Sequence, residues 1–437
     1  MPYTVLYSGP GGARWGQPPA GGRDAPIARL RLLPRERRQT LLGFGGAFTE
    51  AAAYVFSLLP EPAQEEFLGA YFDPGQGLGY TLGRVSIHSS DFSLCSYVYT
   101  APGDEELASF TLAHEQKWLF PLLRRAMRRG KGLALLASPW SPPPWLKTNG
   151  SMLQGGAVRE GAQDKWAAYI DRYLSEMKAQ GLPVGYLSVQ NEAEAVQPWE
   201  SCVYTPAQEA AFVADFLGPR LAQHHPEVRL LGWDHNRDKI LPRADELYGG
   251  RAARYLWGLG FHWYVCDEHR NLTAVHNAWP QKHLLFTEGC LEGGPQPHGW
   301  QPAVRYARDY LQNLNHWCEG FFDWNLLLDW QGGPNHVGNY CHAPILADTA
   351  AGRIHKNSAY YAIGHFSRFL KPGAHCLGLE NPSPLLAAAA QNLDGSLACV
   401  LLNPTDKPMR AQLSLSPGQS VELLLEGEGL ATVHFTA

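Results

Sequence analysis

Short apolar runs alternate along this 437-residue chain with longer segments in which apolar residues recur at spacings of three and four. The short runs predict strands, and the longer segments predict amphipathic helices. The predicted strands span residues 43–50, 81–88, 132–140, 185–192, 228–235, 256–264, 283–290 and 320–327. The clearest helices between them are predicted over residues 114–129, 164–180 and 205–221. Eight strand–helix units over about 320 residues predict an α/β fold, a (β/α)8 TIM barrel with insertions.

The predicted strands share a second feature, a change from apolar to polar or aromatic residues at the C-terminal end. In the fourth strand the sequence YLSVQNE runs from Tyr186 directly into Asn191 and Glu192, where a turn residue would be usual. In a TIM barrel these ends meet on one face, where functional sites lie. The sequence therefore predicts a pocket there. The polar or aromatic residues at the ends are Arg84, His88, Trp140, Asn191, Glu192, Asp234, His235, His262, Tyr264, Glu288, Asp323 and Trp324.

The pattern changes after Leu370, where short alternating strands are separated by Asp-Gly, Asn-Pro and Pro-Gly turns without helical segments. Strand-like runs, YTVLYS and IARLRLL, also occur within the first 40 residues. Together these segments predict an accessory β-sandwich domain formed from both chain termini. The predicted division is residues 1–40 for the N-terminal strands, 41–370 for the barrel and 371–437 for the C-terminal part of the sandwich.

Composition and charge exclude several classes of protein. Hydrophobic residues make up 45% of the chain and aromatic residues 11%, which is typical of a globular protein. The 36 basic and 41 acidic residues leave no basic excess, so we expect no nucleic-acid partner. The N-terminal segment lacks the pattern of a secretory signal, and no apolar run reaches membrane-spanning length. We therefore expect a cytoplasmic location without integral membrane contact, and the oligomeric state stays open.

The spacing of the cysteines and histidines bears on whether the chain binds a metal. The eight cysteines are scattered singly without C-x-x-C pairs, which predicts free thiols over a disulfide framework or a zinc site. A zinc or iron site built from His88, His235, His262 and His269 is the rival interpretation, but the sequence has no H-E-x-x-H or H-x-H spacing. We therefore expect neither a metal nor an organic cofactor.

Two carboxylates are the strongest candidates for chemistry, Glu192 at the end of the fourth strand and Glu288 at the end of the seventh. Carboxyl groups about 5 to 5.5 Å apart suit a retaining glycosidase, in which one attacks the anomeric carbon and the other protonates the leaving oxygen. The charge of one should raise the pKa of the other, so that a nucleophile and an acid coexist near neutral pH. A single glutamate at a strand end is usually a solvated residue or a helix cap, so the interpretation depends on the pair. The aromatic residues of the predicted mouth, whose faces suit sugar rings, are Trp140, Trp199, Tyr264 and Trp324.

Several segments together resemble glycoside hydrolase family 30, the family of lysosomal glucosylceramidase, from about Leu42 to the C-terminus. In chain order they are GFGGAFTEAAA, GRVSIHSSDFS, ASPWSPPPWLKTNGSM, QNEAEA, FHWY, FTEGC, DWNLLLDWQGGPNHVGNY and GHFSRFL. The resemblance implies a (β/α)8 barrel with a β-sandwich built from both termini. Two positions depart from the family pattern, Glu50 in place of the usual Asp and Ala193 in place of the commoner Pro. Neither change removes a candidate catalytic group.

The resemblance also implies roles for individual residues. Glu192 in QNE would be the acid/base, and Glu288 in TEG the nucleophile. Positions that hold the sugar in the family's glucose-binding members are matched by Asp91, Trp140, Asn191 and Trp324. Further pocket positions are matched by Arg84, Asp234, His262 and Tyr264. Asp91 would suit a bidentate hydrogen bond to hydroxyls far from the reacting carbon, which favours glucose over xylose.

We therefore predict a retaining β-glucosidase of glucosylceramidase type that acts on a carbohydrate or glycoconjugate substrate. A β-1,6-glucanase and a β-xylosidase stay open within the same chemistry. From another class, an inactive carbohydrate-binding protein stays open, although a pure binder has no need of two carboxyl groups that repel each other. A metal-dependent barrel hydrolase would lose activity with a chelator. The exact sugar, the aglycone and the choice between endo and exo action are not determined by the sequence.

Overall fold

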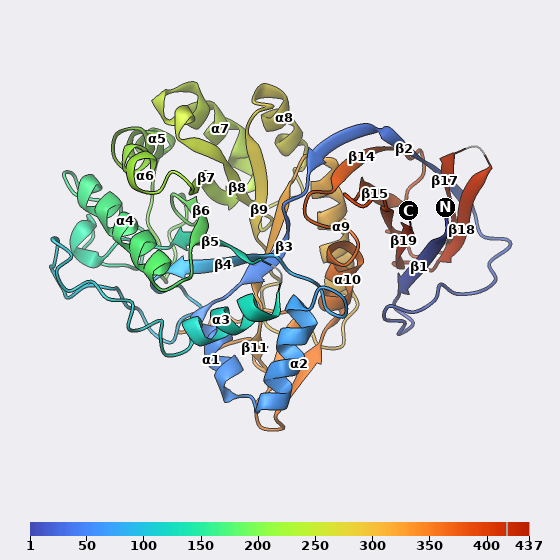
Figure 1. Cartoon of the computed structure of the whole chain (residues 1–437), viewed down its shortest axis with the longest axis horizontal. Helices are drawn as coiled ribbons and strands as arrows, with labels where there is room; N and C mark the ends of the chain where they lie inside the picture. The colour runs from blue at the N-terminus through green and yellow to red at the C-terminus, as the bar shows by residue number, and fades with distance from the viewer. Residues whose placement is uncertain (131, 417, 437) are drawn as a thin grey trace.

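The computed structural model describes residues 1–130, 132–416 and 418–436. Its centre is a closed parallel barrel whose eight strands follow one another in chain order, with the last strand paired to the first (Figure 1). The strands are β3 Gly43–Ala47, β4 Leu82–Ile87, β5 Ala134–Pro139, β6 Val184–Ser188, β7 Arg229–Asn236, β8 Leu256–His262, β9 His283–Glu288 and β10 Gly320–Asn325. Six lie within the predicted strand segments, and β6 and β7 each extend one residue beyond theirs, so the predicted (β/α)8 barrel is confirmed.

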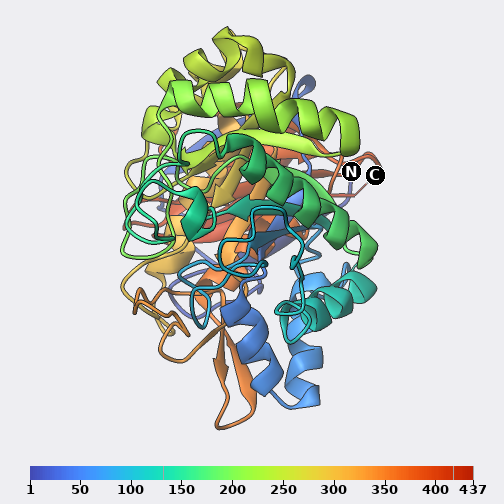
Figure 2. The same cartoon turned by 90° about the vertical axis from the view of Figure 1, so that its left-hand side faces the viewer.

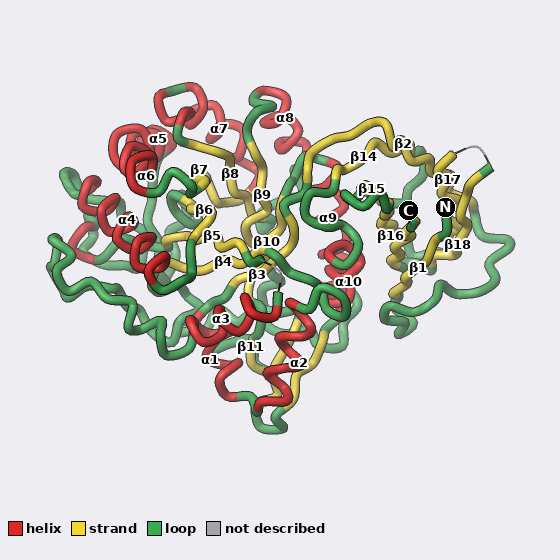
Figure 3. The backbone as a smooth tube through the Cα atoms, in the orientation of Figure 1, coloured by secondary structure: helices red, strands yellow, loops and turns green. Residues whose placement is uncertain are grey.

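Helices surround the strands, as the red segments around the yellow barrel in Figure 3 and the turned view in Figure 2 show. They are α1 Glu50–Leu58, α2 Glu61–Phe72, α3 Leu119–Arg129, α4 Gln163–Ala179, α5 Pro206–Phe212, α6 Gly218–His224, α7 Ile240–Gly249, α8 Arg270–Ala278, α9 Gln301–Asn315 and α10 Ser358–Ser367. Thr205 caps α5, since its side chain accepts a hydrogen bond from the backbone N–H of Gln208.

Two predicted helices differ from the observed ones, and a proline explains each difference. The helix predicted from residue 114 begins at Leu119, because Pro121 has no N–H to donate and is tolerated only in the first turn. The helix predicted over residues 205–221 is divided into α5 and α6 by the π-helical segment Val213–Leu217. Pro219 lies just beyond this segment, where it cannot donate the hydrogen bond of a continuous α-helix.

The interior of the barrel changes from apolar to polar along its axis. An apolar cluster is formed by Leu82, Leu136, Tyr186, Leu231, Leu285 and Phe322. Residues two positions apart along a strand point to the same side. On four of these strands the residues two positions further on are Arg84, Ser138, Ser188 and Thr287, all buried. The apolar cluster therefore fills the barrel on the side of the strand N-termini, and the buried polar layer lies next to the C-terminal strand ends.

Strands from both termini form the second part of the molecule, next to the barrel (Figure 1). They make one eight-stranded mixed sheet in the order β1-β19-β16-β15-β14-β2-β17-β18. Their bounds are β1 Tyr3–Ser8, β2 Ile27–Thr40, β14 His375–Glu380, β15 Leu386–Gln391, β16 Leu397–Leu402, β17 Met409–Ser416, β18 Gln419–Leu425 and β19 Leu430–Phe435. The sheet curls over one core, because residues as distant in strand order as Tyr7 on β1 and Leu423 on β18 belong to the same apolar cluster.

Helix α10 joins this sheet to the barrel. His365 lies fully buried, with Nδ1 2.9 Å from Thr432 Oγ1 and Nε2 2.9 Å from Ser8 Oγ, so it contacts a strand from each terminus. A small sheet of β11 Leu328–Asp329, β12 Ile345–Asp348 and β13 Arg353–Lys356 follows the last barrel strand. Within the described residues, no helix is both long and apolar enough to cross a membrane.

Candidate active site

Asn191 and Glu192 are held over the barrel by backbone hydrogen bonds to the two neighbouring strands. Strand β6 ends at Ser188, and the chain then continues without a surface turn. The N–H of Asn191 donates to Pro139 O on β5 at 2.8 Å, and the N–H of Glu192 donates to Asp234 O on β7 at 2.9 Å. Glu192 has a φ of 49°, in the left-handed region that costs a non-glycine residue energy. Both neighbours therefore hold this strained residue where its side chain faces the barrel mouth.

A bulge in β7 brings two consecutive side chains into the site. The pairing of β7 with β8 shifts register between Trp233 and His235, and Trp233 and Asp234 have φ values of 68° and 51°. A bulge re-aims side chains that would otherwise alternate between the two faces of a strand. Asp234 therefore lies in the buried polar layer, whereas its neighbour His235 faces the mouth.

The mouth contains a cavity of about 130 Å³. Seven of the ten residues predicted for the site line it: Asp91, Trp140, Asn191, Glu192, Tyr264, Glu288 and Trp324. The other three, Arg84, Asp234 and His262, are fully buried behind that lining and contact the glutamates or their neighbours. Their predicted role in substrate binding stays a prediction, and the structure shows them in contact with the glutamates or with the partners of the glutamates.

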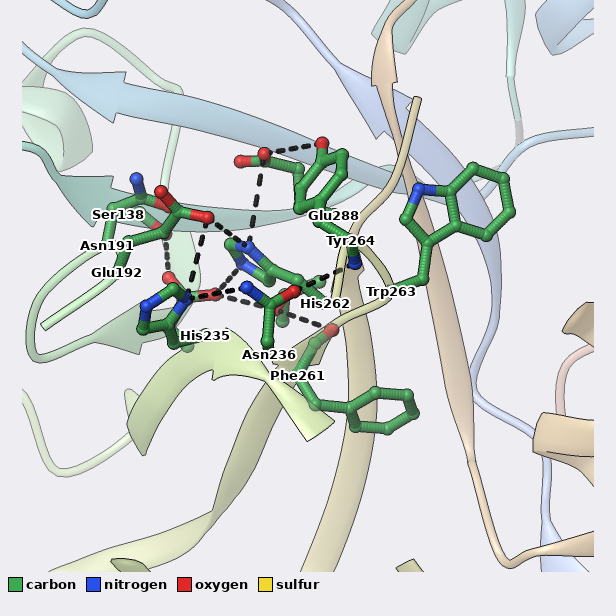
Figure 4. Close-up of polar contacts among 12 residues, drawn as sticks. Ser138, Asn191, Glu192, His235, Asn236, Phe261, His262, Trp263, Tyr264 and Glu288 are labelled. Carbon is green, nitrogen blue, oxygen red and sulfur yellow. Dashed lines mark hydrogen bonds and ion pairs between the residues drawn. The ribbon is translucent and has the colours of Figure 1, made fainter. Parts of the chain in front are cut away.

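Glu288 is held by a cation on one oxygen and a phenol on the other. Arg84 Nη1 donates to Glu288 Oε2 at 2.5 Å, and the Tyr264 hydroxyl donates to Oε1 at 2.8 Å (Figure 4 shows the second contact). Arg84 also donates through Nη2 to Asn191 Oδ1 at 2.8 Å, which links the two glutamate-bearing segments. Two hydrogen bonds, one of them from a cation, therefore fix the direction of the Glu288 carboxylate.

Glu192 has imidazole neighbours instead. Its Oε1 lies 3.2 Å from His262 Nδ1 and 3.5 Å from His235 Nδ1 (Figure 4). Burial alone would raise the pKa of Glu192, but the hydrogen bonds and charges of the two histidines lower it by more, so the pKa lies below the usual range. This differs from the expectation that a neighbouring carboxylate raises it. The reason is that the sequence could not show two imidazoles beside Glu192.

His262 connects the two glutamates. Its Nδ1 lies 3.2 Å from Glu192 Oε1 and 4.0 Å from Glu288 Oε1, so the two carboxylate oxygens are no further apart than these two distances combined. Burial lowers the pKa of His262, but the negative charges of Glu288 and Asp234 and a hydrogen bond to Glu192 raise it to about 9. At neutral pH the ligand-free site therefore holds a proton on His262 while Glu192 is ionised.

Asp234 contacts both cations that lie beside the glutamates, Arg84 and His262. Its Oδ2 accepts hydrogen bonds from Arg84 Nη2 and Ser138 Oγ, both at 3.0 Å. Its Oδ1 accepts one from Thr287 Oγ1 at 2.6 Å and lies 3.1 Å from His262 Nε2. Burial raises the pKa of Asp234, but Arg84 and His262 lower it well below its usual range. One ionised carboxylate thus orients both cations that contact the glutamates.

Asp91 lines the cavity and is held by two asparagines. Its Oδ2 accepts hydrogen bonds from Asn335 Nδ2 at 3.1 Å and Asn339 Nδ2 at 3.3 Å, and none of the described residues donates to its Oδ1. Burial and then the charge of Glu288 raise the pKa of Asp91 to about 7. The Asp91 carboxyl therefore offers one oxygen to a hydroxyl group in the cavity.

Stacked indoles form another wall. The rings of Trp140 and Trp324 stack with centroids 5.4 Å apart, and the Arg84 guanidinium lies 4.9 Å from the Trp140 ring centroid. Phe92 packs edge-on against Trp324. The predicted mouth residue Trp199 also lines the cavity. Flat apolar walls beside directed polar groups suit a sugar ring, which has an apolar face and a rim of hydroxyls.

Sequence reasoning missed part of the lining: Gln197, Asn236, Cys290, Glu292, Asn339 and Cys341. These residues come from loops after the barrel strands or from positions beyond the predicted strand ends. His235 is predicted at a strand end and as a possible metal ligand, but the sequence does not predict its contact with Glu192. The strand-end signal could have suggested Asn236 and Cys290, whereas no local pattern marks the loop residues.

A (β/α)8 barrel with two glutamates facing one cavity at the C-terminal ends of its fourth and seventh strands defines the glycoside hydrolase class. The model of the glycosyl hydrolase family 30 TIM-barrel domain matches residues 41–370. The chain therefore belongs to glycoside hydrolase family 30, a family of retaining O-glycosyl hydrolases.

Three relatives illustrate what the chain is similar to. The lysosomal acid glucosylceramidase of Mus musculus is 32% identical over 428 residues, which cover 91% of this chain and 83% of that protein. The endo-1,6-beta-D-glucanase of Neurospora crassa is 30% identical over 391 residues, which cover 85% of this chain and 80% of that protein. The crystal structure of SrfJ from Salmonella typhimurium has a TM-score of 0.91 at 35% identity and covers 99% of both chains. Relatives with similar sequence identity to this chain are thus named for different substrates.

Proposed function

We propose that this protein is a retaining β-glucosidase of the glucosylceramidase type, which releases a terminal β-linked glucose from its leaving group. The observation that carries the proposal is the difference between the two glutamates. Glu288 accepts hydrogen bonds from the Arg84 guanidinium and the Tyr264 hydroxyl, whereas Glu192 lies beside two imidazoles, of which His262 holds a proton at neutral pH. The first environment suits a nucleophile and the second suits an acid/base.

The proposed reaction has two steps. Glu288 attacks the anomeric carbon from the face opposite the leaving oxygen and forms a covalent glycosyl intermediate. Glu192 protonates that oxygen, and the proton comes from the Glu192–His262 pair, in which it lies on His262 before substrate binds. Glu192 then takes a proton from a water molecule, which attacks the intermediate and releases the sugar with its original configuration. Tyr264 and Arg84 keep the Glu288 oxygens directed throughout.

Asp91 supports the sugar preference. It lines the cavity and one of its carboxyl oxygens accepts no hydrogen bond from the described residues, so it can bind a hydroxyl of a glucose held there. A cavity of about 130 Å³ with stacked indoles on one side favours a single sugar ring over a long cleft. A second candidate, a β-1,6-glucanase, has the Neurospora crassa relative in its favour. The two candidate functions differ in the leaving group, which is a lipid in the first and a glucan chain in the second.

The test is hydrolysis of a matched set of substrates by the purified protein. Aryl β-glucoside, β-xyloside, β-galactoside and β-fucoside measure the sugar preference, and a glucosyl lipid and a β-1,6-linked glucan measure the leaving-group preference. Proton NMR follows the anomeric configuration of the first product. Release of β-glucose before mutarotation, with the lipid preferred over the glucan, is the expected result. Preference for the glucan supports the second candidate, and α-glucose as the first product contradicts the mechanism.

A further inference from the structure

Three nitrogen and oxygen atoms at the mouth lie close enough to share one small cation. They belong to Glu192, His235 and His262, whose potential ligand atoms are all within 4.8 Å of one another. Glu192 Oε1 is 3.2 Å from His262 Nδ1 and 3.5 Å from His235 Nδ1 (Figure 4). These residues come from three successive strand ends, so their approach is a product of the closed barrel and the β7 bulge.

The two distances match the spacing of ligands around zinc. Zinc binds imidazole nitrogen and carboxylate oxygen at about 2.0 to 2.2 Å in tetrahedral geometry, which places neighbouring ligand atoms roughly 3.3 Å apart. The Glu192 contacts lie on either side of this value. Two imidazoles with one carboxylate form a donor set that transition metals prefer over magnesium or calcium.

The surroundings of the three side chains also fit a metal site. His262 Nε2 lies 3.1 Å from Asp234 Oδ1, the contact by which a carboxylate fixes the tautomer of a metal-binding histidine. Asp234 is itself held by Arg84 and Thr287, so this support is rigid. Glu192 and His235 line the cavity, which leaves the remaining coordination position open to water.

We propose that Glu192, His235 and His262 form an inhibitory binding site for Zn²⁺ or a similar transition-metal cation. The ion takes the place of the proton that His262 Nδ1 shares with Glu192, and that proton is released to solvent. The bound metal ion then coordinates the Glu192 carboxylate, which can no longer protonate the leaving oxygen. Metal binding as such needs no substrate, but the inhibitory consequence rests on the proposed acid/base role of Glu192.

The thiols of the same cavity are the rival location for such an ion. Cys290 Sγ is 3.7 Å from the Tyr264 hydroxyl, and the Cys341 thiol lies within hydrogen-bonding reach of Cys290. Two thiols also attract soft metals. They lack the nearby carboxylate-supported histidine, so we assign the ion to the imidazole site and make the thiols an arm of the test.

The first measurement is binding of Zn²⁺ and Co²⁺ to the full, metal-free chain without substrate. Calorimetry should give about one Zn²⁺ per chain, and the visible absorption of bound Co²⁺ should indicate four-coordinate geometry with nitrogen and oxygen ligands. A strong thiolate-to-metal band would place the ion at Cys290 and Cys341 and overturn the assignment. Absence of binding would overturn the inference while leaving the proposed glycosidase function to its own substrate test.

Variants locate the site. His235→Gln and Glu192→Gln each replace an imidazole or a carboxylate by a neutral amide, a weaker zinc ligand, and should weaken Zn²⁺ binding by about 100-fold or more, beyond the 10- to 100-fold typical of outer partners. Glu288→Gln keeps all three donors and should retain binding, although it cannot turn over substrate. His114→Gln is the matched control, because His114 also pairs with a glutamate at 2.7 Å, but with Glu50 at the start of α1, and neither residue lines the cavity.

Activity supplies the second readout. Zn²⁺ should inhibit the wild-type enzyme reversibly, a chelator should restore the rate, and Cys341→Ser should be inhibited at the same concentration. His235→Gln, compared with its own zinc-free rate, should need about 100-fold more Zn²⁺ for the same inhibition. Inhibition that Cys341→Ser removes and His235→Gln leaves unchanged would contradict the proposal. If no glucoside is cleaved, the proposed function fails and the binding measurements still decide the metal site.

Discussion

The two glutamates share one cavity but have different partners. Glu288 faces groups that keep their charge or proton over the whole neutral range, Arg84 and Tyr264. Glu192 faces two histidines, of which His262 holds a proton at neutral pH. The same residue type at equivalent strand ends is therefore prepared for different chemistry. What separates the two roles is the set of side chains that the neighbouring strands bring beside each carboxylate.

A third carboxylate shows what the cations contribute. Asp323 on β10 is buried and accepts one hydrogen bond, from the Tyr306 hydroxyl at 2.6 Å, while its Oδ2 has no partner among the described residues. Burial and then the charge of Glu288 raise the pKa of Asp323 to about 7, although the Tyr306 hydrogen bond opposes the shift. Asp234 is equally buried, but with Arg84 and His262 beside it the pKa falls. Burial alone favours the neutral acid, and a paired cation reverses the outcome.

The largest expected effect comes from removing one glutamate at a time. Glu288→Gln should lower kcat by about 10⁴-fold or more on every substrate, because no nucleophile remains. Glu192→Gln should lower it by roughly 10²- to 10⁴-fold when the leaving group needs a proton. With a dinitrophenyl glucoside, which needs none, Glu192→Gln should show a rapid first release followed by slow turnover. Stopped-flow kinetics measures this, and equal losses in both variants for every leaving group would contradict the assigned roles.

The next effect concerns the buried cation. Arg84→Met leaves Asp234 and Glu288 without their shared positive charge and should destabilise the fold by about 3 to 5 kcal/mol, the usual cost of breaking a buried ion pair. Urea unfolding measures the change. Arg31→Met is the matched control, since its pair with Glu380 is exposed to solvent and should contribute much less. Similar losses in both variants would show that burial does not set the strength of these pairs.

The third effect is a pH dependence of stability. Because Asp323 has a pKa of about 7 when folded and an ordinary value of 3.8 when unfolded, the folded chain binds the extra proton between these values. The contribution of Asp323 to stability is therefore complete below about pH 4 and is lost as the pH rises to about 7, by on the order of 4 kcal/mol. Asp323→Asn should lack this slope, and the exposed Asp24→Asn should keep it. Parallel unfolding profiles for wild type and Asp323→Asn between pH 4 and 7 would contradict the prediction.

The smallest effect tests the phenol beside the nucleophile. Tyr264→Phe removes the hydrogen bond to Glu288 Oε1 and should lower kcat by roughly 10- to 100-fold, equivalent to the 1.5 to 3 kcal/mol of a hydrogen bond to a charged group. Cys290→Ala removes only the weak sulfur contact of the same hydroxyl and should have a smaller effect. Steady-state kinetics on one aryl glucoside compares them. A greater loss for Cys290→Ala would show that the hydroxyl is held by the thiol.

Much of the fold could be predicted because it depends on local patterns. The alternation of short apolar runs with amphipathic segments marks the eight barrel strands, and the polar strand ends mark Glu192 and Glu288. The short alternating runs near both termini mark the strands of the accessory sheet. Each of these signals has a period of a few residues and can be read without knowing which segments meet. Prolines set the helix bounds that the pattern misplaced, at Pro121 and Pro219.

The partners of each glutamate were decided only by the tertiary structure. Arg84 and Glu288 are separated by 204 positions, and His262 and Glu192 by 70, so no sequence period links them. Barrel closure brings these side chains together, and the bulge after Trp233 turns His235 toward the mouth. The sequence by itself determined the barrel, the two carboxylates and the family. Which carboxylate has a cation and which has imidazoles depended on contacts across the barrel, because charge and hydrogen bonding act over a few ångströms in space regardless of separation along the chain.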